Sequence, residues 1–151
     1  MQVLIDLGEG MEPFRRDQFA LLKRIRETVG HSQTETLYFQ DCPSRGAGPR
    51  GAWSWTKHHP PATGRPILVL SDLLIGKVQR FAGIGLEGDW ITWAHTLAES
   101  GNPIVAFVPY PPARWPLGLL RRVLMIPWDR TTTARTLHAL LRGLSRKPQW
   151  R

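Results

Sequence analysis

Three acidic residues stand where they could bind a hard cation. Asp6 ends the apolar run that begins at Val3. Asp72 follows the apolar run Ile67–Ser71, and Glu9 lies in the loop after Asp6. Ligands of open α/β sheets bind beyond the carboxyl ends of the strands, so neighbouring strands would bring these carboxylates into one crevice. Because Mg²⁺ takes oxygen ligands, Asp6 and Asp72 are the candidate metal residues, with Glu9 as a further ligand.

The same aspartates also have a purely structural interpretation. Aspartates in turns commonly accept hydrogen bonds from the backbone two residues further on. Asp6 precedes the turn-forming Gly8-Glu9-Gly10, and Asp72 opens a loop of its own. Strand-end aspartates occur in many α/β domains that bind no metal. We therefore favour the structural interpretation and expect no resident cofactor, with Mg²⁺ as the alternative.

The spacing of other reactive residues supports no self-sufficient active site. Gly8 and Gly10 leave room for an anion to approach the backbone. However, the third glycine of a dinucleotide-binding fingerprint and the lysine of a phosphate-binding loop are missing. His58 and His59 precede two prolines without the regular spacing of metal ligands, so we interpret them as part of a surface loop.

Aromatic residues form a second candidate site. Two tryptophans lie in one loop rich in glycine and proline, and a tyrosine and a tryptophan flank an arginine in another. Tryptophan, tyrosine and arginine are the residues enriched at binding hot spots. The candidate partner-binding residues are Trp53, Trp55, Tyr110, Arg114 and Trp115. Core packing is the alternative for these rings, and it is what we expect for Trp90, Trp93 and Trp128.

The elements that must position these residues alternate between strand and helix. Such alternation predicts a single α/β domain over residues 1–151, with a mainly parallel sheet flanked by helices, which is a Rossmann-like arrangement. The predicted strands are Val3–Asp6, Thr36–Phe39, Ile67–Ser71, Ile104–Val108 and Val123–Ile126. The predicted helices run from Phe14 to Val29, from Trp90 to Glu99 and from Thr131 to Leu144, with a short helical segment at Leu117–Leu120.

Two long loops, residues 41–66 and 73–88, interrupt this alternation. Both are rich in glycine, and the first is also rich in proline. Within the first loop, the alternation of large and small residues in Trp53–Thr56 predicts a short edge strand. After the second loop, Asp89 is well placed to cap the helix that begins at Trp90.

Basic residues are concentrated near the C-terminus. The net charge is +8, and the segment from Ala113 to Arg151 accounts for all of it, with nine lysines and arginines against Asp129 alone. A basic helix of this kind can attract nucleic acid or an acidic partner, or it can simply be a solvated face. No nucleic-acid-binding motif accompanies the charge, so we favour the solvated face and expect at most non-specific binding of nucleic acid.

Cysteine usage and hydropathy bear on location. The single Cys42 excludes an internal disulfide, which suits a reducing compartment. The longest apolar runs are far below the roughly 20 residues that a membrane-spanning helix requires, and the order of a signal peptide is missing. We therefore expect a cytoplasmic protein with no membrane partner. The start directly at a strand indicates a domain that is excised from, or minimal relative to, a longer protein.

Three stretches of the chain resemble a known family. They are Val-Leu-Ile-Asp-Leu-Gly-Glu-Gly-Met-Glu-Pro-Phe from Val3, Leu-Val-Leu-Ser-Asp-Leu from Leu68 and Val-Pro-Tyr-Pro-Pro-Ala-Arg-Trp from Val108. Together they resemble a divergent von Willebrand factor A-like domain of the kind found in large multidomain proteins of high-GC bacteria. The resemblance spans nearly the whole chain and implies an association with signalling or conflict systems.

The family's metal site is only partly matched. Such domains use an Asp-x-Ser-x-Ser loop after the first strand, a threonine from a later loop and an aspartate after the fourth strand. Asp6 matches the first aspartate and Asp72 the later one, but Gly8 and Gly10 replace both serines. No threonine can be placed. The resemblance therefore implies a degenerate metal-ion-dependent adhesion site and a fold retained as a scaffold.

Three functional hypotheses follow. The first, which we favour, is a non-enzymatic protein-interaction or scaffolding domain that binds another protein or another domain of its parent protein. The second is a Mg²⁺-dependent phosphoryl-transfer or nuclease domain in which Asp6, Glu9 and Asp72 hold the metal. The third is nucleic-acid binding through the basic C-terminal helix.

Overall fold

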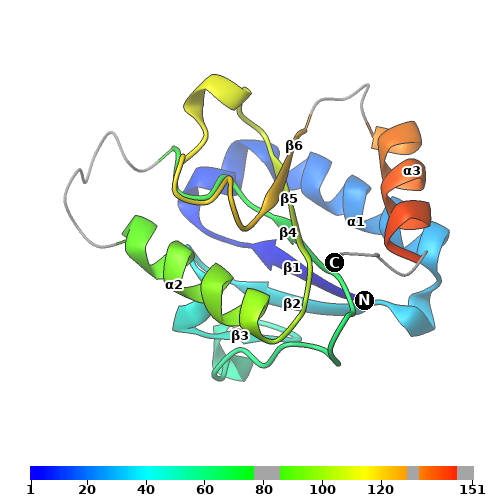
Figure 1. Ribbon diagram of the computed structural model, residues 1–151, viewed down its shortest axis with the longest axis horizontal. Coiled ribbons are helices and arrows are strands. Elements are labelled where there is room, and N and C mark those ends of the chain that lie inside the picture. Colours follow the sequence, from blue (N-terminus) through cyan, green and yellow to red (C-terminus); the bar gives the residue numbers. More distant parts are fainter. Residues whose placement is uncertain (77–85, 129–132, 146–151) are drawn as a thin grey trace.

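One mixed sheet organises the part of the chain that the computed structural model describes, residues 1–76, 86–128 and 133–145 (Figure 1). Its six strands run in the order β3-β2-β1-β4-β5-β6. The strands are β1 (Gln2–Asp6), β2 (Glu35–Phe39), β3 (Ala47–Gly48), β4 (Ile67–Leu70), β5 (Ile104–Val108) and β6 (Leu124–Pro127). All neighbours pair in parallel except β2 and β3. The predicted α/β class with a mainly parallel, Rossmann-like sheet is therefore confirmed.

The three central strands are apolar because both faces of the sheet are covered. Every residue of β1, β4 and β5 is buried, as expected of parallel strands packed between two layers of helices. The edge strand β6 is different, since Leu124 and Pro127 at its two ends are exposed. The near-continuous apolar runs in the sequence therefore mark the centre of the sheet.

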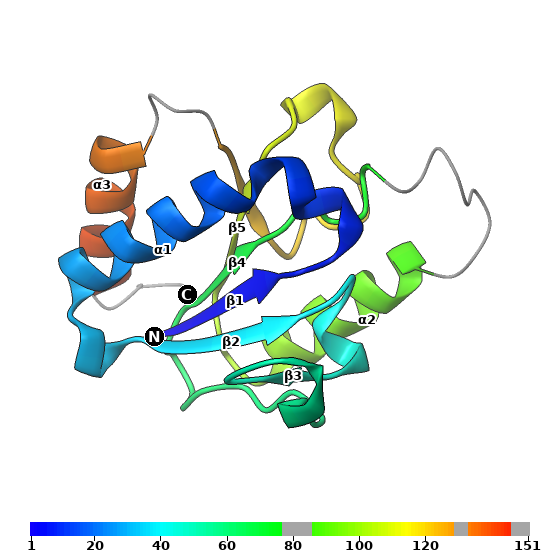
Figure 2. The same cartoon turned by 180° about the vertical axis from the view of Figure 1, so that it is seen from behind.

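Helices cover the two faces of the sheet. The helix α2 (Leu86–Glu99) lies in front of the sheet in Figure 1. The helices α1 (Arg15–Val29) and α3 (Thr133–Ser145) pack beside each other on the opposite face, as Figure 2 shows. At the end of α1, Gly30 has a φ of 99° and its N–H donates to the carbonyl oxygen of Arg26. Glycine adopts this conformation without strain, so the predicted end of the helix at Val29 is confirmed.

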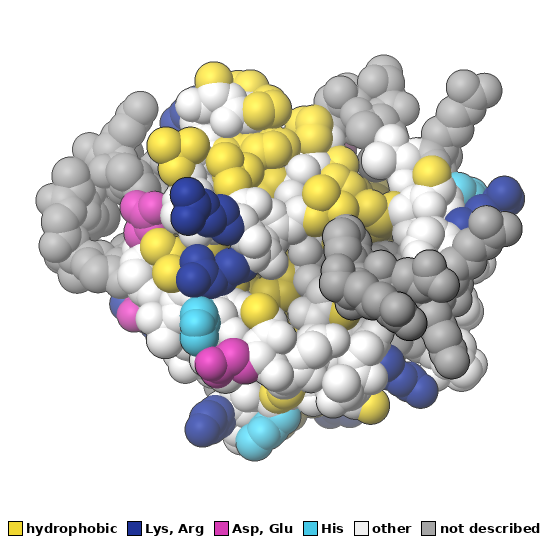
Figure 3. Space-filling model, in the orientation of Figure 1, with side chains coloured by type: hydrophobic (Ala, Val, Ile, Leu, Met, Phe, Trp, Pro, Cys, Tyr) yellow, Lys and Arg dark blue, Asp and Glu magenta, His cyan; other side chains and the backbone are white. Residues whose placement is uncertain are grey.

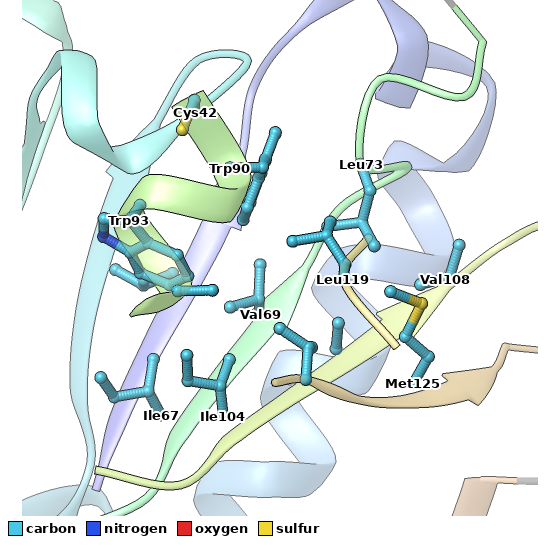
Figure 4. Close-up of a cluster of buried hydrophobic side chains, with 14 of the residues drawn as sticks. Cys42, Ile67, Val69, Leu73, Trp90, Trp93, Ile104, Val108, Leu119 and Met125 are labelled. Carbon is cyan, nitrogen blue, oxygen red and sulfur yellow. The ribbon is translucent and has the colours of Figure 1, made fainter. Parts of the chain in front are cut away.

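The α2 face is built around two tryptophans (Figure 4). The rings of Trp90 and Trp93 meet edge to face at 5.4 Å, and Phe39 of β2 meets Trp90 in the same way at 5.9 Å. Edge-to-face pairs add about 0.5–1.5 kcal/mol to the stabilisation that burial provides. The predicted core packing of Trp90 and Trp93 is confirmed, and Trp128 packs half-buried against the α1 face.

Several local predictions were wrong. Residues Trp53–Thr56 form no edge strand: a 3-10 helix spans Ala52–Ser54, and Thr56 makes one isolated bridge to Ala47. The edge strand is β3 instead, because Gly48 has no side chain and lets Ser54 pack directly against it. The helix α2 begins at Leu86, ahead of the predicted start at Trp90.

Two further local predictions also differ from the structure. Asp89 lies inside the first turn of α2 and does not cap the helix; its carboxylate instead pairs with Arg45 at 2.9 Å. The segment 117–120 forms consecutive turns in place of a helix. Residues 77–85 of the second predicted loop lie outside the described residues. None of the helices described here is long and apolar enough to span a bilayer.

Candidate functional site at the carboxyl ends of β1 and β4

The carboxyl ends of β1 and β4 lie side by side. The two strands pair in parallel with Ile5 opposite Leu70, so the predicted neighbourhood of their terminal acids is confirmed. The chain crosses from β1 to β2 on one side, whereas β4 and β5 extend the sheet on the other. Such a reversal of strand order is where open α/β sheets form their ligand-binding crevices. The residues that follow Ile5 and Leu70 are therefore the candidate site.

Asp6 is the centre of this site. Only 1% of the residue is exposed. Its Oδ2 accepts a hydrogen bond of 2.7 Å from the hydroxyl of Ser71. Its Oδ1 accepts from the backbone N–H groups of Gly8 at 2.8 Å and Asp41 at 3.2 Å. One carboxylate thus joins the ends of three strands, β1, β2 and β4.

Burial dominates the electrostatics of Asp6. It raises the pKa of the carboxyl to about 6, and the nearby charge of Asp72 acts in the same direction. Hydrogen bonds from Ser71, Gly8 and Asp41 oppose the rise because they favour the charged form. The carboxyl of Asp6 therefore titrates near pH 6, well above the ordinary range of an aspartate.

Asp72 organises the loop that follows β4. Its Oδ1 accepts from the N–H of Leu74 at 3.1 Å, and its Oδ2 accepts from the N–H of Gly76 at 3.2 Å. Leu73 and Leu74 have φ values of 51° and 66°, a left-handed conformation that is unfavourable for leucine. The hydrogen bonds to the Asp72 carboxylate offset this strain. Burial raises the pKa of Asp72, and the charge of Asp41 contributes to the rise.

The two glycines of the first loop lie directly against the carboxylates. A Cβ atom on Gly10 would overlap Oδ2 of Asp72. A Cβ atom on Gly8 would lie 2.7 Å from Oδ1 of Asp41 and 3.0 Å from Oδ1 of Asp6. Serine at either position would have to displace a carboxylate. The two glycines therefore have a steric role as well as lacking hydroxyl ligands. Their backbone lies so close to the carboxylates that a serine side chain has no room there.

The predicted metal residues do not converge on one point. Asp6 and Asp72 are buried, whereas Glu9 is exposed on the short 3-10 helix Glu9–Phe14. Across the part of the chain that the structure describes, no group of three or more histidine, cysteine, aspartate or glutamate side chains could hold a metal ion. Each oxygen of the Asp6 and Asp72 carboxylates accepts at least one hydrogen bond from an N–H or O–H group. The three-carboxylate Mg²⁺ site expected from Asp6, Glu9 and Asp72 is therefore not formed among the described residues.

Three of the predicted partner-binding residues form one cluster next to this site. The guanidinium carbon of Arg114 lies 4.4 Å from the centroid of the Tyr110 ring, and Nε1 of Trp115 donates to the Tyr110 carbonyl oxygen at 2.8 Å. Phe14 meets the ring of Tyr110 edge to face at 5.8 Å. The Tyr110 hydroxyl also reaches the loop of Asp72, since it lies 3.2 Å from where a Cβ of Gly76 would be.

The other two predicted partner-binding residues lie elsewhere. Trp53 is 78% exposed beside β3, and Trp55 donates from Nε1 to the carbonyl oxygen of Arg50 at 3.1 Å. Strand β3 is one edge of the sheet, whereas Tyr110 follows β5 near the other edge. Figure 1 accordingly separates the two segments, with residues 52–54 at the bottom and residues 112–114 at the top. The five candidates thus form two surfaces.

Sequence reasoning missed the buried glutamine behind the site. Gln18 of α1 is fully buried, and its Nε2 donates to the carbonyl oxygens of Asp6 at 2.8 Å and Leu70 at 3.0 Å. It therefore ties the ends of β1 and β4 together, while its Oε1 has no hydrogen-bond partner. The sequence does indicate that Gln18 is buried, because it falls on the same helical stripe as the buried Leu21 and Ile25. No sequence pattern indicates that Ser71 and Asp41 donate hydrogen bonds to Asp6.

His58 corrects the prediction of a surface loop at residues 58 and 59. Its ring is buried, and Nε2 lies 2.7 Å from Oε1 of Gln2. The indole N–H of Trp93 donates to Nδ1 of His58 at 3.2 Å. Only His59 is exposed. A histidine before two prolines looks like loop surface in sequence, but here the helix α2 packs over it.

Comparison with protein-family models, with curated proteins and with solved structures gives no match to the chain.

Proposed function

We propose that the chain is a non-enzymatic interaction or scaffolding domain, built on a von Willebrand factor A-like fold with a degenerate metal-ion-dependent adhesion site. The proposed partner is another protein or another domain of its parent protein. Asp6 and Asp72 occupy neighbouring strand ends, as the family pattern requires, with glycine at both serine positions. A role in signalling or conflict systems stays a prediction from the family resemblance.

The single observation that carries the proposal is the contact between Gly10 and Asp72. The backbone of Gly10 leaves no room for even a Cβ beside the Asp72 carboxylate. Asp6 and Asp72 use their oxygens to fix the loops after β1, β2 and β4. The two carboxylates therefore hold the loops in one conformation. A loop surface that is already ordered loses little conformational entropy when a partner binds, which favours binding.

The metal arm of the test is a calorimetric titration of the protein with MgCl₂ and with MnCl₂. We expect no stoichiometric binding by the wild type. The matched control is Glu27→Gln, which removes an exposed carboxylate from α1. Tight stoichiometric Mg²⁺ binding that disappears in Asp6→Asn but persists in Glu27→Gln would contradict the proposal. It would instead favour the phosphoryl-transfer or nuclease hypothesis.

The partner arm compares proteins captured by immobilised wild type and by two variants. Arg114→Ala removes the cation over the Tyr110 ring, and Lys23→Ala removes an exposed cation of α1 as a matched control. We expect a captured protein that Arg114→Ala loses and Lys23→Ala retains. Equal capture by all three proteins would count against the Tyr110 cluster as a binding surface.

A further inference from the structure

Exposed leucines gather on one side of the molecule. Among the described residues five large hydrophobic side chains are exposed, and three of them fall within residues 117–124. They are Leu117 at 79%, Leu120 at 44% and Leu124 at 56%. Figure 3 shows hydrophobic side chains collected over the segment that leads from the 3-10 helix at residues 112–114 into β6. We call these three residues the leucine surface.

The leucine surface is held in place by buried neighbours. Leu119 and Val123 are 1% and 4% exposed and pack into the core on the α2 face. The Val123 N–H donates to the Leu119 carbonyl oxygen at 2.9 Å, and the Leu119 N–H donates to that of Pro116 at 3.1 Å. Gly118 lies so close to α2 that a Cβ would be 2.7 Å from Cδ1 of Ile91. The outward leucines are therefore presented by an anchored turn.

Cations border the leucine surface. Arg121 and Arg122 are exposed between Leu120 and Leu124, and basic side chains lie beside the hydrophobic patch in Figure 3. Within the described residues no ion pair neutralises either arginine, and the stretch 110–128 contains no aspartate or glutamate. Glu87 of α2 lies close to this turn, with its Oε1 3.5 Å from where a Cβ of Gly118 would be. The surface thus combines apolar contact area with two arginines that form no ion pair with any of the described acidic residues.

We propose that the leucine surface, with Arg121 and Arg122, binds an acidic amphipathic segment of another protein. The partner's apolar side chains would pack on Leu117, Leu120 and Leu124, and its carboxylates would face the two arginines. This inference rests on the proposed function and specifies the chemistry of the partner. Contiguous apolar patches bordered by polar residues commonly mark protein-interaction sites, and charge complementarity selects among partners.

Two other occupants fit the surface less well. A second copy of the chain, docked symmetrically, would bring the arginines of both copies to one interface, where like charges repel. Nucleic acid would use the arginines for phosphate contacts but would leave three aliphatic leucines without a partner. Both occupants are separate outcomes of the experiment below.

The test is a selection from a display library of random 16-residue peptides against the immobilised wild-type protein. We expect enriched peptides to combine leucine-like side chains with aspartate or glutamate. A synthetic copy of an enriched peptide is then titrated against Leu117→Asp and against the double variant Arg121→Glu with Arg122→Glu. Affinity should fall about tenfold or more in each.

Matched controls change the same properties on α1. Phe19→Asp alters another exposed apolar residue, and Arg16→Glu with Lys23→Glu reverses the same number of charges. Both should retain the wild-type affinity within about twofold. Circular dichroism spectra and unfolding temperatures verify that every variant folds, and a variant that does not fold is replaced by Leu120→Gln or Leu124→Gln.

The inference is overturned by enriched peptides without acidic residues, or by an affinity that the patch variants leave unchanged. It is also overturned by a dimer in sedimentation that Leu117→Asp abolishes, which identifies a second copy. If duplex DNA binds in a way that Arg121→Glu with Arg122→Glu abolishes but Leu117→Asp leaves unchanged, the ligand of this surface is nucleic acid instead.

Two outcomes concern the proposed function. If acidic peptides are enriched but their binding is lost only in Trp53→Ala or Tyr110→Ala, the leucine surface is refuted while the protein remains an interaction domain. Stoichiometric Mg²⁺ binding at Asp6 contradicts the proposed function, regardless of the outcome of the peptide experiment.

Discussion

The indole N–H of Trp93 donates to Nδ1 of His58, and this fixes the form of the histidine. Because Nδ1 is the acceptor, the ring proton sits on Nε2 and is donated to Oε1 of Gln2 at 2.7 Å. If the ring took up a second proton, Nδ1 would also carry a hydrogen. It would then face the indole N–H of Trp93 as a second donor, and the hydrogen bond would be lost. The neutral imidazole is therefore the form that the fold accommodates.

Acid should destabilise the protein through His58. Burial lowers its pKa to about 4 from the ordinary 6.5. Between these values the unfolded chain binds the proton and the folded chain does not, so the stability from this residue is present above pH 6.5 and is lost as the pH falls toward 4. In His58→Gln we expect the free energy of unfolding to lose this dependence, on the order of 2 kcal/mol across the window. Urea unfolding at pH 4.5, 5.5 and 7 measures it, with the exposed His59→Gln as control; equal slopes in both variants would refute the prediction.

Asp6 should act in the opposite direction. Its folded pKa of about 6 exceeds the ordinary 3.8, so between these values the folded chain binds the proton more tightly than the unfolded chain. The cost of burying its charge is therefore absent below pH 3.8 and complete above pH 6. Relative to wild type, Asp6→Asn should gain stability as the pH rises from 4 to 7, by on the order of 2 kcal/mol. A difference between the two unfolding curves that is constant with pH would show that the Asp6 carboxyl titrates normally.

Gly10→Ser should destabilise the fold without creating a metal site. The new Cβ would overlap the Asp72 carboxylate, and forced overpacking costs about 1–3 kcal/mol. The matched control is Gly88→Ala in α2, where a Cβ meets nothing within 4 Å and should stabilise by about 0.5–1 kcal/mol. Thermal unfolding with and without MgCl₂ provides the readout. A Gly10→Ser variant that is as stable as wild type, or that Mg²⁺ stabilises, would contradict the geometry of this loop.

Trp53 and Trp115 should respond differently to truncation. Trp53 is 78% exposed, so Trp53→Ala should change the free energy of unfolding by less than about 0.5 kcal/mol. Trp115 packs against the core and donates to the Tyr110 carbonyl oxygen, so Trp115→Ala should cost about 2 kcal/mol or more. If Trp53 is an anchor for a partner, its loss should cost about 2 kcal/mol in binding alone. Chemical unfolding and partner titration on both variants separate the two roles, and an unfolded Trp53→Ala would refute its assignment to the surface.

Nucleic acid should bind weakly and without sequence preference. The basic excess lies between Ala113 and Arg151, of which residues 129–132 and 146–151 are outside the described structure. Phosphate contacts release counterions, so any affinity should fall by about tenfold or more between 50 and 200 mM salt. Fluorescence anisotropy with two unrelated duplexes tests this. A complex that prefers one duplex and persists at 200 mM salt would support the nucleic-acid hypothesis.

The centre of the sheet could be predicted from sequence because its signal is local. The runs in β1, β4 and β5 are apolar on both faces, and each is followed by a loop. The two-residue strand β3 has no such signal, since it depends on Gly48 meeting Ser54. The aromatic residues could be recognised by type, but their division into two surfaces follows from the strand order.

The candidate site was predictable only in part, for the same reason. Asp6 and Asp72 stand out as acids at strand ends, and their proximity follows from the parallel pairing of β1 and β4. The hydrogen bond from Ser71 to Asp6 joins residues 65 positions apart, and nothing in either neighbourhood specifies it. The burial of His58 depends equally on a distant helix, which covers the ring with Trp93.

The pairing of β1 with β4 has a consequence during protein synthesis. One edge of β1 pairs with β4, which is synthesised 65 residues later. At about 5–20 residues per second, synthesis leaves this apolar strand without that neighbour for roughly 3–13 s. Throughout this interval the nascent chain carries an unpaired edge on a strand that is fully buried in the folded protein. Until translation has passed β4, this unpaired edge should make the nascent chain more prone to aggregate than the folded protein.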